Sequence, residues 1–245
     1  MIKLQRPEKP VQLTDEQIAE LIAEFKLSEE SVWKQSYITE PLLEMSFGKC
    51  CFCETKINEE SKYMEVEHFH PKSIYKDEVV DWDNLLPICK RCNGKKSNHD
   101  TKLQPIINPV IDNPKEHLKI KDYRFIKLSD LGITTIDIIN LNDSQRLVKK
   151  RFEIGEEIYN KLENLVESTH DYIQNPITRR RNRIINTLSN LMLEGTKEYE
   201  YSATAATVIL ENMNYQEIKQ LFIDNKLWET EFIELEQQMQ YCALI

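Results

Sequence analysis

Hydrophobic and polar residues near the start of the chain follow the period of an α-helix. In residues 14–25, TDEQIAELIAEF, the larger apolar residues recur three or four positions apart, and Thr14 followed by Gln17 is typical of a helix N-cap. A second helix is expected over residues 31–45, where Pro41 predicts a kink or a break. The sequence therefore predicts that an amphipathic helical segment opens the chain.

The second half of the chain has the same helical pattern after an irregular connector at residues 105–118, which holds three prolines in its first ten positions. Short apolar runs at 123–128 and 134–140 favour strands. Beyond Asp143 the pattern predicts helices over about 144–173, 177–193, 203–210 and 215–240.

The composition agrees with a mainly helical globular protein. The 245 residues are 40% hydrophobic and 30% charged, with only 5 glycines. No run approaches the roughly 20 apolar residues of a membrane span, and the first residues lack the apolar stretch of a signal peptide. We therefore expect a cytoplasmic protein without a membrane partner.

The net charge of −9 hides opposite local charges. Residues 184–245 hold three lysines and ten acidic residues, a net of −7, whereas residues 90–102 hold five basic residues and one aspartate, a net of +4. The basic segment can face phosphate, and the acidic one is a poor contact for nucleic acid.

The cysteines indicate a metal site. Cys50 and Cys53 form one CxxC pair and Cys89 and Cys92 form another, a spacing that suits four thiolate ligands around one structural zinc ion. The alternative is two unrelated pairs of buried or redox-active cysteines. A closed four-thiolate site has no open coordination position, so this zinc would stabilise the fold and the chemistry would lie elsewhere.

Between the two pairs lies the segment with the most chemistry. MEVEHFH at residues 64–70 predicts a strand with Val66, His68 and His70 on one face, ending at Pro71. WDNLLP predicts a loop and a second strand, and a short helix is expected from Cys92.

Three motifs in this segment resemble the HNH endonuclease motif in its ββα-metal form: EHFHP at 67–71, DNL at 83–85 and CKRCNGKKS at 89–97. The wider sequence also resembles the HNH subunit of Septu-type and retron-associated anti-phage defence systems, the PtuB-like proteins. The resemblance implies an α+β, predominantly α-helical fold with a ββα-metal HNH core and a four-cysteine zinc site embedded in N- and C-terminal helices. We divide the chain into an N-terminal helical segment (1–46), the nuclease core (47–105), and a connector with a mainly helical domain that docks a partner (106–245).

The resemblance also assigns roles to individual residues. It implies that Glu67 and Asn93 ligate a catalytic Mg²⁺ or Mn²⁺ ion and that His68 activates water. Asn84 would fix the loop and orient that base, and Lys96 would meet the phosphate. Taken singly, the two asparagines are better explained by ordinary turn and helix-cap duty, and only the ordered set of motifs overturns that explanation.

Two further histidines are weaker candidates. His70 would touch the metal or the phosphate if it shared the face of His68, and a structural role is an equal alternative. His99 lies six residues after Asn93, further than the one-turn spacing that a shared ion needs.

The implied function is metal-dependent hydrolysis of nucleic acid in anti-phage defence, in association with an ABC-type ATPase that contacts the acidic helical end. The resemblance favours DNA as the substrate and leaves RNA, including tRNA, open. A rival interpretation is a non-catalytic zinc-ribbon-like module that binds nucleic acid or protein. It explains the cysteines but leaves Glu67, His68, Asn84 and Asn93 as a coincidence.

Overall fold

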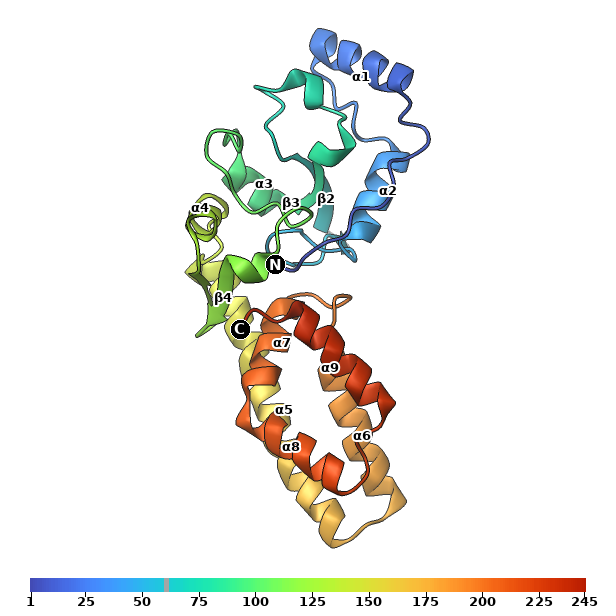
Figure 1. The fold of residues 1–245 in the computed structure, drawn as a ribbon, viewed down its shortest axis with the longest axis vertical. Helices are drawn as coiled ribbons and strands as arrows, with labels where there is room; N and C mark the ends of the chain where they lie inside the picture. Colours follow the sequence, from blue (N-terminus) through green and yellow to red (C-terminus); the bar gives the residue numbers. More distant parts are fainter. Residues whose placement is uncertain (60–61) are drawn as a thin grey trace. The chain divides into compact units, whose positions relative to one another are not determined.

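The computed structural model describes residues 1–59 and 62–245. The chain divides into two compact units, which are described separately. The first contains Met1, residues 3–117 and residues 127–141, and the second contains Ile2, residues 118–126 and residues 142–245. Both units are drawn in Figure 1 with the colours of the sequence.

The predicted N-terminal helices are present in the first unit. Helix α1 (Asp15–Ser28) begins after Thr14, whose hydroxyl accepts a hydrogen bond from the backbone N–H of Gln17. Helix α2 (Ser36–Met45) begins later than predicted and contains Pro41 within it. The proline lies in the second turn and does not end the helix.

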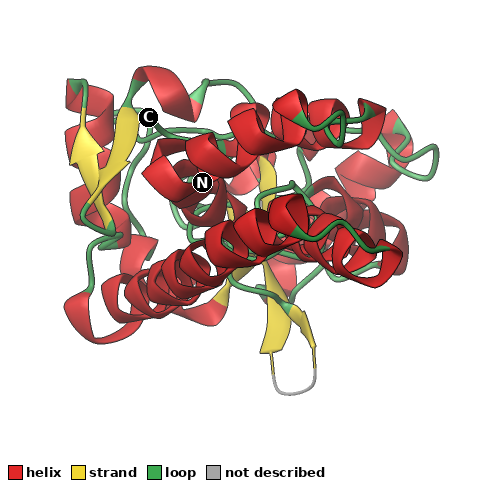
Figure 2. Ribbon diagram, turned by 90° about the horizontal axis from the view of Figure 1, so that it is seen from below, coloured by secondary structure: helices red, strands yellow, loops and turns green. Residues whose placement is uncertain are grey.

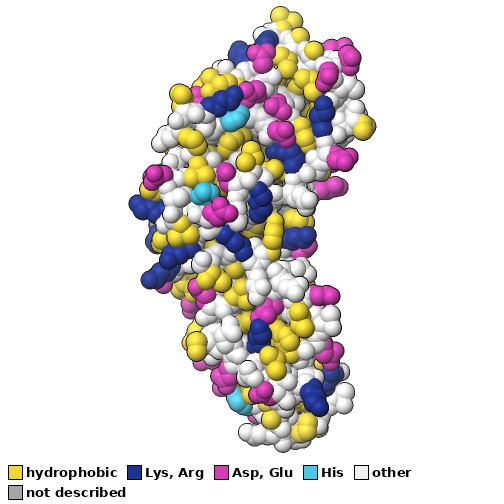
Figure 3. Space-filling model, viewed as in Figure 1, with side chains coloured by type: hydrophobic (Ala, Val, Ile, Leu, Met, Phe, Trp, Pro, Cys, Tyr) yellow, Lys and Arg dark blue, Asp and Glu magenta, His cyan; other side chains and the backbone are white. Residues whose placement is uncertain are grey.

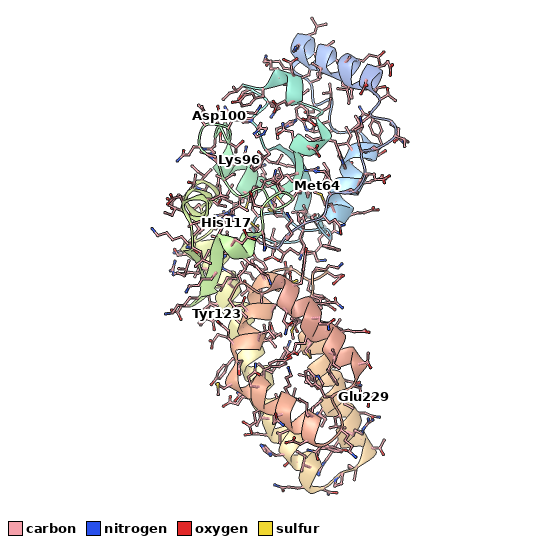
Figure 4. All side chains as sticks on the ribbon, in the orientation of Figure 1. Met64, Lys96, Asp100, His117, Tyr123 and Glu229 are labelled. Carbon is pink, nitrogen blue, oxygen red and sulfur yellow. The ribbon has the colours of Figure 1, made fainter. Side chains whose placement is uncertain are left out.

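The predicted ββα core follows. Strands β1 (Asn58–Glu59), β2 (Lys62–His68) and β3 (Leu85–Cys89) form an antiparallel sheet in the order β1-β2-β3. Two 3-10 turns, η1 (Lys76–Glu78) and η2 (Trp82–Asn84), lie between β2 and β3, and helix α3 (Lys90–Lys96) follows β3 directly. Figure 4 labels Lys96 on α3 and Met64 on β2, the two elements that carry most of the predicted site.

The register of the sheet decides which predicted residues can meet. Met64 pairs with Cys89 and His68 pairs with Leu85, so the end of β2 lies beside the start of β3. The expectation that His70 extends this strand is wrong, because β2 ends at His68 and the chain turns away before Pro71.

One predicted strand is a helix. Residues 134–140 lie in and just after α4 (Asp130–Ile139). The side chain of Ser129 caps the start of this helix by accepting a hydrogen bond from the N–H of Gly132, and Asn140, directly after its end, has the left-handed conformation. These two end signals outweigh the β-branched residues inside the helix. A further 3-10 turn, η3 (Pro114–Glu116), precedes the hairpin of β4 (Leu118–Lys121) and β5 (Arg124–Lys127), which confirms the strand predicted at 123–128.

The second unit is built mainly of helices. A π-helical turn, η4 (Ser144–Val148), leads into the long helix α5 (Lys149–Gln174), which packs against α6 (Thr178–Leu193), α7 (Ser202–Glu211) and α8 (Met213–Asp224). Helix α9 (Thr230–Cys242) packs on α6 and α7. The single helix predicted over 215–240 is therefore two helices, separated by a turn in which Lys226 has a positive φ of 56°.

The fold class predicted from the sequence is confirmed, because helices predominate, as Figure 2 shows. The strands in the described part of the chain form two small sheets. Within the described ranges, no helix has both the length and the apolar content of a membrane span. The boundaries expected at residues 46 and 105 stay a prediction, although α1 and α2 belong to the same compact unit as the ββα core.

Candidate active site and metal centre

The four paired cysteines form one buried cluster. The ligand atoms of Cys50, Cys53, Cys89 and Cys92 all lie within 4.8 Å of one another. The sulfur atoms of Cys53 and Cys89 are 3.7 Å apart. Tetrahedral coordination with zinc–sulfur bonds of about 2.3 Å places neighbouring sulfurs about 3.8 Å apart. The cluster therefore fits a four-thiolate zinc site, as the spacing predicted.

Local structure explains why these cysteines converge. Cys89 is the last residue of β3 and the N-cap of α3, where its sulfur accepts a hydrogen bond from the N–H of Cys92. The first pair lies in the turn before β1, and the N–H of Cys51 donates to the carbonyl of Pro87 on β3. The two pairs are thus joined through the edge of the sheet.

The thiols in this cluster differ in their tendency to ionise. Burial alone raises the pKa of Cys50, but hydrogen bonds with the neighbouring cysteines outweigh it and hold this pKa well below its usual value. Burial raises the pKa of Cys51 well above its usual value, so this thiol stays protonated. Cys51 lies outside the cluster of four sulfur atoms, which makes it a packing residue.

His68 is buried at the end of β2, with 4% of its surface exposed. Its Nε2 atom lies 2.9 Å from the carbonyl oxygen of Val79. The centre of its ring lies 4.5 Å from the centre of the Trp33 ring, and the two rings meet edge to face. Burial, with the positive charge of Lys72, lowers the pKa of His68 to about 3, and the hydrogen bond to Val79 opposes this only in part. The imidazole is therefore neutral at pH 7.

Asn84 holds the loop that carries Val79. Its side-chain oxygen accepts from the N–H of His70 at 2.6 Å, and its side-chain nitrogen donates to the carbonyls of His70 and Glu78, each at 3.1 Å. Both ends of the segment between β2 and η2 are thereby fixed by one buried amide. The role implied for Asn84 in orienting the base stays a prediction.

Glu67 and Lys96 form a buried ion pair with the carboxylate and the ammonium 2.5 Å apart. The ammonium also donates to the carbonyl of His68 at 3.0 Å. Burial raises the pKa of Glu67 to about 6, and the charge of Lys96 limits that rise. Lys96 is only 1% exposed, so in this structure it stabilises Glu67 and the end of β2. Its contact with phosphate stays a prediction.

Asn93 lies on α3, facing β2. Its side-chain nitrogen donates to a carboxylate oxygen of Glu65 at 2.7 Å. Reasoning from the sequence missed Glu65, although the two-residue period of a strand places it on the same face as Glu67. Glu65, Glu67 and Asn93 offer only oxygen donors, the set that Mg²⁺ and Mn²⁺ prefer. The residues present therefore fit a hard divalent ion.

The remaining predicted candidates have contacts of their own. The Nδ1 atom of His70 lies 2.7 Å from the hydroxyl of Thr101, and the ring of His99 lies beside the carbonyl of Gln104 at 2.7 Å. Arg91, in the basic segment, donates to the carbonyls of Ile139 and Asn140 at the end of α4. Figure 3 shows basic and acidic side chains interspersed over the face in view.

Comparisons with known proteins agree with this geometry. A family model described as HNH endonuclease matches residues 50–101, which contain both cysteine pairs and all five predicted catalytic residues. The Septu protein PtuB of Bacillus thuringiensis is 45% identical over 238 residues, covering 96% of this chain and 92% of the relative. A Septu protein PtuB of Bacillus mycoides (strain KBAB4) is 29% identical over 162 residues, covering 51% of this chain and 53% of the relative.

No solved structure matches the chain significantly. The match to the Bacillus thuringiensis protein extends over nearly all of both chains, so it includes the helical second unit as well as the nuclease motif. The chain therefore belongs to the PtuB family of Septu proteins and is an HNH endonuclease.

Proposed function

We propose that this chain hydrolyses phosphodiester bonds of DNA with the help of Mg²⁺ or Mn²⁺, as the nuclease subunit of an anti-phage defence complex with an ABC-type ATPase. The observation that carries the proposal is the hydrogen bond between His68 Nε2 and the carbonyl of Val79. It fixes which nitrogen of the ring can act as a base.

The argument rests on the tautomer of His68. A carbonyl oxygen only accepts hydrogen bonds, so the 2.9 Å contact requires that Nε2 carry the proton. In a neutral imidazole the other nitrogen, Nδ1, then has a free lone pair. His68 is thus held in the form that accepts a proton from water through Nδ1.

The low pKa of His68 belongs to the site without substrate, in which the imidazole is a weak base. Burial and Lys72 disfavour the imidazolium before the substrate binds. A phosphodiester anion placed beside the ring favours the protonated form, because opposite charges attract strongly at a buried site. Binding of the substrate would therefore raise the basicity of His68 when it is needed.

Glu67 and Asn93 would hold the divalent ion, with Glu65 beside them. When bound, such an ion stabilises the charge that develops on the phosphate and on the leaving oxygen. Lys96 keeps Glu67 in place, and Asn84 keeps the loop that orients His68. The zinc site would hold β3 and α3 at the angle on which all of these contacts depend.

The second unit supplies the proposed docking surface for the ATPase. Helices α8 and α9 hold five of the ten acidic residues between positions 184 and 245 and also expose Met213, Ile223 and Ile233. Apolar side chains surrounded by one sign of charge are typical of a surface that recognises a protein. Co-purification of the ATPase with the wild-type chain, and its loss in Met213→Asp/Ile233→Asp, would support this part of the proposal.

The test of catalysis compares two histidine variants. Wild type, His68→Ala and the control His99→Ala, a change at a partly buried histidine, are incubated with plasmid DNA or with tRNA, with Mg²⁺ or Mn²⁺, alone and with the ATPase. We expect cleavage of DNA by wild type and His99→Ala, and a loss of about 10²- to 10⁴-fold in His68→Ala. Equal cutting by His68→Ala would remove His68 from the mechanism, and cutting of tRNA alone would replace DNA by RNA.

A further inference from the structure

A groove opens beside the predicted site in the first unit. It has a volume of 890 Å³ and lies between α2, the β1–β2 hairpin and the turn before α2. Its lining includes Trp33 and Lys34 from that turn, Thr39 and Leu43 from α2, and Asn58 and Tyr63 from the hairpin. Its place in the fold makes it a candidate for binding the substrate.

The groove reaches Asn93, one of the two predicted metal ligands, and its neighbour Glu65. Glu65 and Asn93, joined by a 2.7 Å hydrogen bond, both line it. Trp33 also lines it and contacts the ring of His68, while the ammonium of Lys72, another lining residue, lies 5.1 Å from the centre of the Trp33 ring. The indole of Trp33 therefore touches both the proposed base and the groove.

The charge of the groove is nearly balanced. Lys34 and Lys72 offer two cations, and Glu40, Glu59 and Glu65 offer three carboxylates. Attraction between charges alone therefore does not explain the binding of a polyanion here. Any nucleic acid in the groove has to be held largely by stacking and by hydrogen bonds to groups such as Thr39 and Asn58.

Tyr63 offers the surface for stacking. This side chain is on β2, lines the groove and is 80% exposed. A large aromatic side chain with so much exposed surface is typical of a residue that binds a ligand. An exposed aromatic ring binds the flat face of a base, and that face is available only when the base is not stacked in a duplex.

We infer that this groove binds unpaired nucleotides next to the scissile phosphate, with one base stacked on Tyr63 and the phosphates near Lys34 and Lys72. The substrate class is therefore a single strand, or a melted or damaged segment of a duplex. The inference rests on the proposed nuclease function, which identifies the ligand as nucleic acid. It adds that the substrate is unpaired and that Tyr63 is the residue that recognises the unpaired base.

Binding to oligonucleotides tests the inference. The intact chain is titrated into a fluorescent 12-nucleotide DNA strand, or into the same strand annealed to its complement, without added Mg²⁺ or Mn²⁺. We expect at least tenfold tighter binding of the single strand, and a loss of about 5- to 150-fold in Tyr63→Ala, the range for one stacked base. Tyr63→Phe keeps the aromatic face and should bind within about twofold of wild type.

Tyr159→Ala is the matched control, because Tyr159 is an exposed tyrosine of the second unit. Its affinity for the strand should equal that of wild type. The logarithm of the affinity should fall with the logarithm of the salt concentration with a slope of only about −1.4, since two lysines contact phosphates. Because Tyr63 and Tyr159 are exposed, both variants should keep the melting temperature of wild type.

Three outcomes overturn the inference: no binding of the strand by wild type, equal affinity of Tyr63→Ala and wild type, or equal affinity for strand and duplex. A protein segment seated in the groove in a structure of the complex with the ATPase would overturn it as well. Cleavage assays separate the two proposals. Cutting of DNA that is equal in wild type and Tyr63→Ala refutes the proposed role of the groove and leaves the nuclease mechanism intact. Equal cutting by wild type and His68→Ala removes His68 from the mechanism, whereas the binding of the strand to the groove is measured independently of cutting.

Discussion

The side-chain amide of Asn84 donates a 3.1 Å hydrogen bond to the carbonyl of Glu78, the residue directly before Val79. Val79 in turn accepts from His68. Two residues of the HNH motif that are far apart in the sequence are thus linked through the backbone of one loop. The orientation of the proposed base therefore depends on an asparagine whose side-chain hydrogen bonds go to the loop and not to the imidazole.

This relationship predicts the effect of Asn84→Ala. The substitution leaves the partly buried N–H of His70 and the carbonyl of Glu78 without the side chain that bonds them, at a cost of about 1–3 kcal/mol for an unsatisfied group. Cleavage should fall by about 10²-fold or more, because the loop no longer holds His68 in one tautomer. Thermal unfolding and cleavage rates measure the two effects, and Asn225→Ala, which removes an exposed hydrogen bond to Leu221, should change neither.

The cysteine cluster predicts a contrast between neighbouring residues. Cys89→Ser should lower the zinc content from about one ion per chain to near zero and lower the melting temperature, because a lost ligand removes folding free energy. Cys51→Ala, a change at a buried thiol outside the ligand set, should keep the zinc. The zinc content of each variant is measured by elemental mass spectrometry. Full zinc content in Cys89→Ser would refute the assignment of Cys89 as a ligand.

The buried pair of Glu67 and Lys96 predicts a large loss of stability in Lys96→Met. The uncompensated carboxylate should lower the free energy of unfolding by about 3–5 kcal/mol at pH 7 in urea titrations. Adding Glu67→Gln should restore part of the loss. Lys149→Ala, which removes an exposed pair with Glu153, should cost no more than about 0.5 kcal/mol.

The same variant should depend on pH in a defined direction. The pKa of Glu67 is already raised to about 6 in the folded chain, and removing Lys96 raises it further. Protons then bind the folded state more tightly than the unfolded one, so Lys96→Met should become more stable as the pH falls from 7 to 5. A stability that decreases over this interval relative to wild type would contradict the assignment of the pair.

Asn93→Ala should separate the two metal sites. The zinc content should stay at about one ion per chain, because Asn93 is not part of the cysteine cluster. The Mg²⁺ concentration for half-maximal cleavage should rise about 10- to 100-fold, the usual effect of disturbing a metal site at one residue. Asn98→Ala, an exposed change just after α3, is the control, and loss of zinc in Asn93→Ala would show that the sites are assigned wrongly.

Local signals in the sequence were sufficient for much of the fold. The Thr14 cap and the period of apolar residues located α1, and the two CxxC pairs located the cysteine cluster. Prediction failed where two local signals competed. Residues 134–140 combine β-branched residues with helix end signals, and residues 215–240 keep a helical period across the turn between α8 and α9.

The sequence by itself determined which chemical groups this nuclease has: four thiolates in two pairs, a histidine beside a glutamate, and two asparagines in the order of the HNH motif. These depend on residue type and short spacings, which folding does not alter. Only the tertiary structure decided the tautomer of His68, the burial of Lys96 against Glu67, and the contact of Asn93 with Glu65. Each of these contacts joins residues at least eleven positions apart, and their distances exist only once β2, β3 and α3 have packed together.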